Sequence, residues 1–229
     1  PSFDFLTLPL KIISSYSTAF VTPSLYQLYS PYGNSSLTPE KNSTAEVGFE
    51  TQFANKKIRW NLVGFYREQT NFIGFYFNPV TDASNYVNIN GLNKAKGIET
   101  EIQFVLSNQL KWNSNYTFTQ VDEALDRLIP KHKLNSSLDY KVSDRLFWNV
   151  SYQYIDARKD AFFDGNTYVT TPVNLGSYQL VNTLARYEII KNRCSVFGSA
   201  QNIFNVDFVE NMGYSTLGRN FKFGITLIW

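Results

Sequence analysis

The residues most often used in catalysis are scarce in this chain of 229 residues. His132 is the only histidine, so a Ser-His-Asp triad would have a single possible base. Cys194 is the only cysteine, which excludes an intrachain disulfide and a cysteine-rich metal site. Asp122, Glu123 and Asp126 form a carboxylate cluster that could hold calcium but is more typical of a solvated loop. With no phosphate-binding loop, CxxC or HExxH motif, the residues predict neither an enzyme nor a metal or cofactor site.

Aromatic rings offer a different chemistry, that of ligand binding. The chain contains 15 Tyr, 19 Phe and 4 Trp, and many of these rings lie in long segments rich in Asn, Ser, Thr and Gly. Rigid amphipathic rings among adaptable polar side chains are typical of a binding surface. The rings of these segments are Tyr26, Tyr29, Tyr32, Phe75, Tyr76, Phe77, Phe162, Phe163, Tyr168 and Tyr214. We expect some of them to contact a ligand and the others to pack one loop against another.

Charge and hydropathy exclude two further classes of protein. Lys and Arg number 21 against 19 Asp and Glu, and a net charge of +2 gives no basic footprint for nucleic acid. The mean hydropathy is −0.26. No run approaches the roughly 20 apolar residues of a membrane helix. A chain rich in rings, poor in charge and without apolar helices is unusual for a soluble enzyme.

The elements that must position the rings show the period of a β-strand. In the segment 110–119, the even positions are mostly apolar or aromatic and the odd positions are polar. Because successive side chains of a strand point to opposite faces, this alternation predicts one apolar and one polar face. The same pattern predicts ten strands, at 11–20, 44–53, 58–69, 89–106, 110–120, 132–141, 145–156, 177–188, 193–202 and 220–229.

Strand and loop lengths favour a membrane barrel over its alternative, a soluble β-sandwich. Most segments are about ten residues long, as a tilted crossing of a bilayer requires. Short connections (54–57, 107–109, 142–144 and 189–192) alternate with long ones (21–43, 70–88, 121–131, 157–176 and 203–219). Outer-membrane barrels have short periplasmic turns and long external loops. We therefore predict an all-β fold, an antiparallel transmembrane β-barrel.

Tryptophan provides an independent indication. Trp60, Trp112 and Trp148 each follow a short turn by a few residues, and Trp229 ends the last strand. All four share the parity of the apolar face. Tryptophan prefers a membrane interface because its ring is apolar and its N–H needs a polar partner. The four positions therefore predict a ring of tryptophans at the periplasmic edge.

The opposite parity predicts a polar lumen. Charges facing lipid are costly, whereas a polar or water-filled interior accommodates them. The side chains expected to point inward are Glu46, Glu50, Gln52, Arg59, Asn61, Glu99, Glu101, Gln103, Asn113, Asn115, Asn135 and Asp139.

Several segments resemble TonB-dependent outer-membrane receptors, most of all the vitamin B12 (cobalamin) transporter group. The similarity covers the whole chain and includes a Gly-hydrophobic-Glu strand entry at Lys96–Glu99. The segments that carry it are Ser15–Phe20, Pro23–Leu25, Gln27–Tyr29, Tyr32–Asn34, Pro39–Lys41, Lys96–Glu99, Pro130–His132, Gln201–Asn205 and Gly218–Phe221.

This resemblance implies a particular organisation. Such receptors have a 22-stranded barrel, an N-terminal plug and a segment that contacts TonB. Residues 1–229 would then form the C-terminal part of the transmembrane barrel domain, about ten strands, with the plug and the earlier strands outside this chain. The implied location is the outer membrane of a Gram-negative bacterium, as a multi-pass protein.

The resemblance also implies a function. The protein would bind a scarce nutrient on its extracellular loops and import it by TonB-coupled gating, with cobalamin as the favoured substrate. A siderophore or haem receptor is the alternative within the family, and a passive porin or a ten-stranded outer-membrane protease lies outside it. Expected partners are outer-membrane lipid, TonB, the small-molecule ligand and a surface-exposed lipoprotein, but no nucleic acid.

Four residues are the candidate substrate contacts. Tyr214 is similar to an aromatic residue of the final outer loop that faces substrate in cobalamin transporters. Arg127 lies near a position where that group has basic residues. Phe163 falls in the next long loop, where an aromatic is also expected. Tyr76 adds a ring from an earlier long loop.

Overall fold

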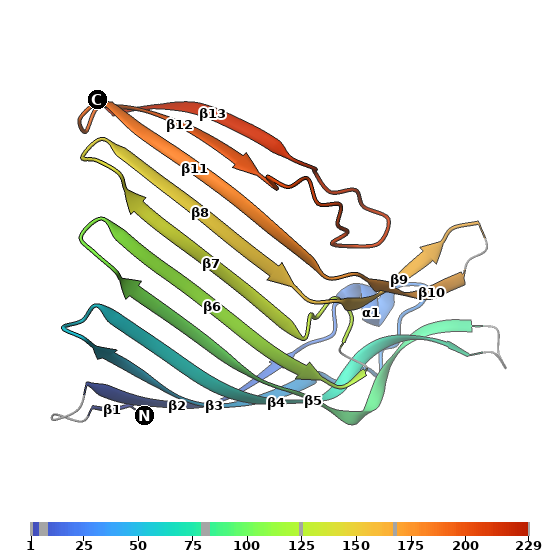
Figure 1. Cartoon of the computed structure of the whole chain (residues 1–229). Helices are drawn as coiled ribbons and strands as arrows, with labels where there is room; N and C mark the ends of the chain where they lie inside the picture. Colours follow the sequence, from blue (N-terminus) through green and yellow to red (C-terminus); the bar gives the residue numbers. More distant parts are fainter. Residues whose placement is uncertain (1, 5–8, 79–82, 124–125, 167–168, 229) are drawn as a thin grey trace.

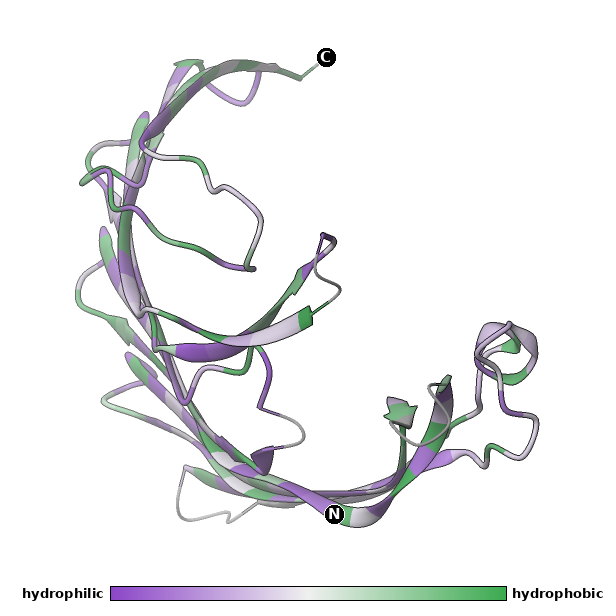
Figure 2. Cartoon of the chain, turned by 90° about the vertical axis from the view of Figure 1, so that its right-hand side faces the viewer, coloured by the Kyte–Doolittle hydropathy of each residue, from purple (hydrophilic) through white to green (hydrophobic). Residues whose placement is uncertain are grey.

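The chain forms a curved antiparallel sheet, described by a computed structural model for residues 2–4, 9–78, 83–123, 126–166 and 169–228. Eleven strands are hydrogen-bonded in the order β1-β2-β3-β4-β5-β6-β7-β8-β11-β12-β13, and β9 pairs with β10 separately. Figure 1 shows short turns at one end of the sheet and long loops at the other, and Figure 2 shows that the sheet curves into an open arc. The elements are β1 (Ser2–Asp4), β2 (Leu10–Val21), α1 (Leu25–Tyr29), β3 (Glu40–Phe53), β4 (Ile58–Asn78), β5 (Ala83–Val105), β6 (Leu110–Val121), β7 (His132–Lys141), β8 (Leu146–Ile155), β9 (Arg158–Asp164), β10 (Val169–Leu175), β11 (Tyr178–Ile190), β12 (Cys194–Gln201) and β13 (Asn220–Leu227).

All ten predicted strands are confirmed, but two are much longer than expected. The segment 70–88 was predicted as a loop, whereas β4 continues to Asn78 and β5 begins at Ala83. The pairing of β4 with β5 continues because a bulge between Thr70 and Phe72 accommodates the shift in register, with Asn71 at a φ of 58°. Aromatic and β-branched residues beyond the bulge then favour extended pairing. The result is a hairpin that projects past the rest of the sheet on the long-loop side (Figure 1).

Two long loops contain regular structure that the alternation did not predict. The segment 157–176 folds into the β9–β10 hairpin, which extends over the concave side of the arc (Figure 2). The loop after β2 contains α1, which begins with a capping box. Ser24 Oγ accepts from the Gln27 amide and Gln27 Oε1 accepts from the Ser24 amide.

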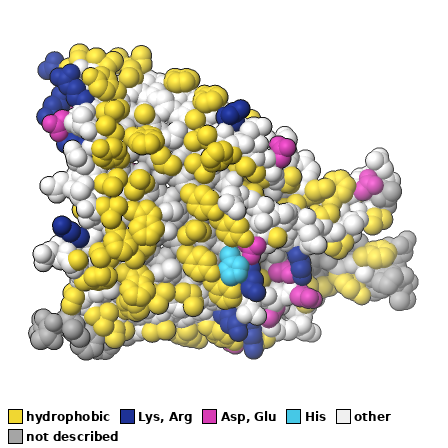
Figure 3. Space-filling view, viewed as in Figure 1, with side chains coloured by type: hydrophobic (Ala, Val, Ile, Leu, Met, Phe, Trp, Pro, Cys, Tyr) yellow, Lys and Arg dark blue, Asp and Glu magenta, His cyan; other side chains and the backbone are white. Residues whose placement is uncertain are grey.

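The convex face of the arc is apolar, as the strand parity predicts. Figure 3 shows this face covered by a band of hydrophobic side chains with charges gathered toward its ends. Near the end of the chain, Phe223 is 81% exposed and Ile225 is 69% exposed. Rings and branched chains so open to the surroundings are stabilised by lipid rather than by a protein core. The described residues contain no helix with the length and apolarity needed to span a membrane.

The tryptophans lie on the convex face near the short turns and follow one bonding pattern. Trp60 Nε1 donates to Thr100 Oγ1 at 2.9 Å, and Trp112 Nε1 donates to Ser136 Oγ at 2.7 Å. Trp148 Nε1 likewise donates to Thr183 Oγ1 of the neighbouring strand at 2.7 Å. In each case the acceptor is two residues from the tryptophan's register partner. The predicted row is confirmed for these three residues, while Trp229 lies outside the described residues.

The Trp112 bond gives a stability prediction. Trp112→Phe removes the donor to Ser136, and we expect it to lower the free energy of unfolding by about 1 kcal/mol. Urea unfolding of the full-length receptor in lipid vesicles measures the change. Tyr140→Phe is the control, because no hydrogen bond of the Tyr140 hydroxyl is found among the described residues. Equal midpoints for Trp112→Phe and the wild type would contradict the assigned bond.

The concave face is polar, and its side chains are bonded across the strands. The register aligns Glu50, Asn61, Glu101, Asn115 and Asn135 in one row of five adjacent strands. Asn135 Nδ2 donates to Asn115 Oδ1 at 2.9 Å. In a parallel row, one carboxylate, that of Asp139, accepts from amides on both neighbouring strands at 3.1 and 2.7 Å. This network confirms the predicted inward orientation and makes the concave face the wall of a polar lumen.

Candidate ligand-binding loops

Three of the long loops meet on the concave side through one buried carboxylate. Asp160 of β9 is 4% exposed. Its Oδ1 accepts from Arg127 Nε of the β6–β7 loop at 2.9 Å, and its Oδ2 accepts from the Met212 amide of the β12–β13 loop at 2.7 Å. It also accepts from the Ala161 amide at 2.8 Å. Asp160 therefore joins three segments that are distant in sequence.

A buried arginine strengthens the same connection. Arg158 is 8% exposed, and its Nη2 donates to the carbonyl oxygens of Val209 and Glu210 at 2.9 and 3.1 Å. The guanidinium carbon lies 5.3 Å from the centroid of the Tyr178 ring. The Tyr178 hydroxyl in turn donates to Glu210 Oε1 at 3.3 Å. We call Arg127, Arg158, Asp160, Tyr178 and Met212 the outer-loop junction.

Hydrogen bonds and charges at the junction favour the ionised form of the Asp160 carboxyl. The pKa of the Asp160 carboxyl is lowered, chiefly by the amide of Met212, with the Ala161 amide and the Arg127 guanidinium adding to the effect against burial. Next to the junction, Lys159 Nζ lies 2.7 Å from Asp126 Oδ2, and this bond and charge raise the pKa of Lys159. The ion pairs Arg127–Asp160 and Lys159–Asp126 both hold the β6–β7 loop against β9.

Three of the four candidate contacts lie on the segments that the junction joins. Arg127 is part of it and keeps its side chain 66% exposed. Tyr214 is 74% exposed and follows Met212 by two residues. Phe163 is 57% exposed on β9, and a Cβ built on Gly213 of the β12–β13 loop would lie 3.9 Å from the ring of its neighbour Phe162. Two rings and a cation are thus presented by loops that are fixed to one another.

The fourth candidate, Tyr76, belongs to a different assembly of loops. The β4–β5 hairpin packs against the loop that carries α1, through an edge-to-face contact of 5.7 Å between the rings of Phe75 and Tyr32. Tyr86 lies 5.1 Å from Phe75, and its amide donates to the carbonyl oxygen of Tyr32 at 3.0 Å. Tyr76 is 52% exposed on the opposite face of β4 from Phe75. The structure therefore places it on a separate part of the outer surface from the junction.

Arg158 and Asp160 fall in the segment 157–176, which the alternation predicts as a loop, and neither was among the candidate site residues. One signal was present, because Arg158, Lys159 and Asp160 are three successive charges in a chain that is only 17% charged. What the sequence could not supply was their partners, which lie 33 to 52 residues away.

The residues considered for catalysis lie away from the junction. His132 is on the convex face, where its Nδ1 bonds to the Tyr116 hydroxyl at 2.8 Å and its ring stacks on that of Tyr116. Cys194 is half-buried and pairs with Leu227 of β13. In the predicted carboxylate cluster, Asp122 accepts from the Lys94 amide at 2.7 Å, whereas Asp126 pairs with Lys159.

An antiparallel sheet with an apolar convex face, a row of tryptophans near its short turns and a polar concave face is the wall of a transmembrane β-barrel. Residues 4–203 match the family described as TonB dependent receptor-like, beta-barrel, and the chain belongs to this family of receptors. Members of the family are outer-membrane, multi-pass proteins of Gram-negative bacteria, as is this barrel, and they are transporters and receptors rather than enzymes.

Individual relatives agree with this assignment. The chain is 30% identical to the vitamin B12 transporter BtuB of Vibrio cholerae over 217 residues, which is 93% of this chain and 34% of BtuB. A ferric enterobactin receptor (PfeA) from Pseudomonas aeruginosa shares the fold with a TM-score of 0.81 at 20% identity, over 98% of this chain and 39% of PfeA. The P. aeruginosa receptor FpvA, solved with pyoverdine and iron, gives 0.79 at 19% identity, over 98% and 31%. The chain spans about a third of the length of BtuB.

Proposed function

We propose that the full-length protein binds a corrinoid of the cobalamin type on its outer loops and imports it across the outer membrane. The observation that carries the proposal is the 30% identity to a vitamin B12 transporter over 93% of this chain. No covalent chemistry is part of this proposal, in which binding and gating perform the transport.

The outer-loop junction supports the proposal physically. Loops held in place before binding lose little conformational freedom when the ligand arrives, so more of the contact energy appears as affinity. Tyr214 and Phe163 present broad apolar rings, which suit a large macrocycle. Arg127 supplies a cationic donor beside them. Tyr76, on the β4–β5 hairpin, would contact the ligand from the other loop assembly.

Energy coupling requires parts that lie outside this chain. In the proposal, residues 1–229 are the C-terminal part of a 22-stranded barrel whose plug is N-terminal and contacts TonB. The concave face provides a surface for such a plug, with a polar hollow of about 200 Å³ lined by Asn113, Asn115, Asn135 and Gln153 among others. A surface-exposed lipoprotein is a further proposed partner, which would cover the outer loops.

A siderophore receptor is the second candidate function. It is favoured by the fold shared with the enterobactin and pyoverdine receptors. Saturable binding of cyanocobalamin by the full-length receptor, measured against a ferric catecholate and ferric pyoverdine, decides between them. Binding of an iron chelate without binding of cyanocobalamin would replace the substrate assignment and leave the transporter class intact.

The proposed contact of Tyr214 with the ligand can be tested by mutation. Tyr214→Ala should weaken ligand binding about tenfold, because Tyr214 lies two residues from Met212 of the junction and an aromatic ring in contact with a ligand is a typical binding hot spot. Phe204→Ala is the matched control, since Phe204 lies in the same loop and is 73% exposed against 74% for Tyr214. Arg127→Ala should also weaken binding, partly through the loss of its bond to Asp160. Unchanged affinity in both Tyr214→Ala and Arg127→Ala would refute the site.

A further inference from the structure

The convex face carries an apolar hollow of about 720 Å³ near the short turns that join the last strands of the chain. Ala185 and Gly198, which pair with each other on β11 and β12, form its floor with no group larger than a methyl. Phe223 on β13 pairs with Gly198 and forms one wall. Apolar surface of this kind is stabilised by hydrocarbon. The other lining residues, all uncharged, are Leu146, Tyr187, Val196, Phe197, Gly224 and Ile225.

The depth of this hollow in the bilayer follows from Trp148. This residue belongs to the tryptophan row of the periplasmic interface, and its register partner Ala185 lines the hollow. The β7–β8 and β11–β12 turns lie beyond the row, so their polar side chains reach the headgroups of the inner leaflet. A lipid in the hollow would therefore place its glycerol near Tyr187, at the end nearer the turns, and its phosphate at the turns themselves.

Cations predominate at these two turns. Arg145 ends the β7–β8 turn, and Lys191 and Arg193 lie in the β11–β12 turn. The Arg145 carbonyl accepts from the Glu188 amide of β11 at 2.8 Å, and the Arg193 carbonyl accepts at 2.8 Å from the Ile228 amide that follows β13. These bonds hold both turns against the strands that form the hollow. Figure 3 shows basic side chains gathered at the upper left, at the short-turn end of the hydrophobic band.

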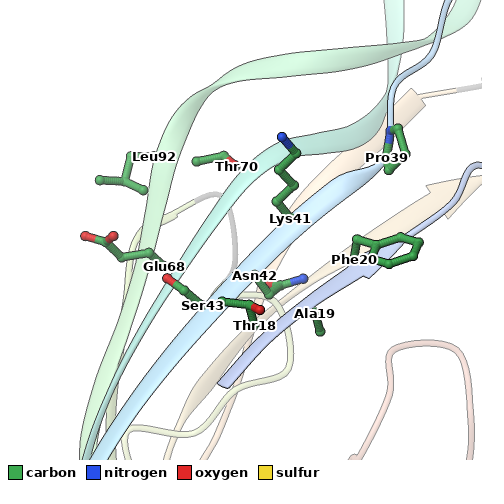
Figure 4. Close-up of a pocket in the computed structure, with 10 residues that line it drawn as sticks. All are labelled: Thr18, Ala19, Phe20, Pro39, Lys41, Asn42, Ser43, Glu68, Thr70 and Leu92. Carbon is green, nitrogen blue, oxygen red and sulfur yellow. The ribbon is translucent and has the colours of Figure 1, made fainter. Parts of the chain in front are cut away.

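The carboxylates near these cations do not balance them. Residues 141–145 and 186–193 carry five cations and two carboxylates, and with every group ionised this region has a net charge of +3 against +2 for the whole chain. The hollow at the outer edge of the convex face, shown in Figure 4, differs because Lys41 and Glu68 both line it. An excess of positive charge therefore distinguishes the hollow at the short turns from the one in Figure 4.

Among the described residues of the two turns, the one ion pair joins Lys141 to Asp144. The pKa of Asp144 is lowered, chiefly by its bond to Lys141 and to a smaller extent by the charge of Lys191, because the two turns lie side by side. Within the same described residues, no carboxylate forms an ion pair with Arg145, Lys191 or Arg193. Each of the two guanidinium groups can therefore donate to a phosphate through two N–H groups.

We propose that the hollow and the two turns form a binding site for an anionic phospholipid of the inner leaflet, phosphatidylglycerol. Its phosphate lies between the turns and contacts Arg145 and Arg193, and one of its acyl chains lies over Gly198 beside the Phe223 ring. Phosphatidylethanolamine has the same phosphate but adds an ammonium group, which the excess positive charge of the turns disfavours. The site faces lipid, on the opposite side of the sheet from the lumen, and is independent of the transported substrate.

The test is retention of lipid by the full-length receptor, purified in mild detergent and analysed by native mass spectrometry. Phosphatidylglycerol and phosphatidylethanolamine with the same acyl chains are supplied in equal amounts. We expect Arg145→Gln/Arg193→Gln to retain phosphatidylglycerol about 25-fold more weakly, since each cation near an anionic lipid contributes about a factor of five. Lys56→Gln/Lys57→Gln is the matched control, because it removes two cations from the short turn after β3 and should retain the lipid as the wild type does.

A further variant tests the hollow separately. Ala185→Leu fills it without altering charge and should also reduce retention of phosphatidylglycerol, in receptor shown to be folded by its gel mobility. The proposal is overturned if Arg145→Gln/Arg193→Gln or Ala185→Leu retains as much phosphatidylglycerol as the wild type. An equal loss in Lys56→Gln/Lys57→Gln would overturn it as well, because any cation of the short turns would then suffice. Equal retention of the two phospholipids by the wild type would have the same consequence, since the site would not distinguish their charge.

Discussion

Gly97→Val is expected to abolish assembly of the barrel. A Cβ at Gly97 would overlap the carbonyl oxygen of Phe118 on β6 and come within 2.6 Å of the Phe65 ring on β4. The first of these neighbours is backbone and cannot rotate away, so the β5–β6 ladder would have to separate locally. Glycine beneath a cross-strand aromatic ring is a recognised device for packing in sheets. A valine side chain at position 97 would prevent this packing of the Phe65 ring.

The measurement is the amount of folded full-length receptor in the outer membrane, distinguished from unfolded protein by its gel mobility without heating. Gly64→Ala is the matched control, because Gly64 lies on the adjacent strand and its Cβ would have no neighbour nearer than 3.8 Å. Wild-type levels of folded Gly97→Val receptor would show that the strands accommodate the side chain and that the close approach is unimportant.

Asp160→Ala is expected to release the three outer loops from one another while the barrel still assembles. The substitution removes the acceptor of Arg127, Met212 and Ala161. Hydrogen bonds to a charged group are worth about 1.5–3 kcal/mol each, so local opening should become easier by on the order of 2 kcal/mol. Amide exchange at Met212 should then accelerate roughly 30-fold, and ligand affinity should fall with it.

Asp207→Ala provides the control. Asp207 is exposed in the β12–β13 loop, which also carries Met212, and its side chain has no bond among the described residues. Unchanged exchange at Met212 in Asp160→Ala would mean that the loops are held by other contacts. Acid should mimic the substitution. Since the folded pKa of Asp160 is depressed, its stabilisation is present above the ordinary pKa of an aspartate and is lost as the pH falls through the depressed value.

The spanning strands could be predicted because lipid imposes a strict alternation on them. Trp112 and Phe118 share a parity and both face outward in the structure, while Asn113 and Asn115 face inward. The β4–β5 extension was missed because its rings, such as Phe75 and Tyr86, pack on the loop that carries α1 rather than on lipid. Alternation carries no information once both faces of a hairpin lie outside the membrane.

The candidate site could be predicted only in part from the sequence, for a related reason. Tyr214 and Phe163 were identified as rings in polar loops, which is a local property of the sequence. Asp160 acts through donors on three segments, and Arg127 and Met212 are 33 and 52 residues from it. Contacts of this kind depend on where the barrel brings the loops together, so no local pattern specifies them.

The tryptophan bonds affect how the barrel sits in its bilayer. Because Trp60, Trp112 and Trp148 donate to hydroxyls of the protein itself, their N–H groups need no headgroup at a fixed depth. When the surrounding bilayer thins or thickens, the barrel can therefore shift along the membrane normal without breaking these three bonds. These three bonds therefore do not fix the depth of the barrel, which is left to the height of the apolar band.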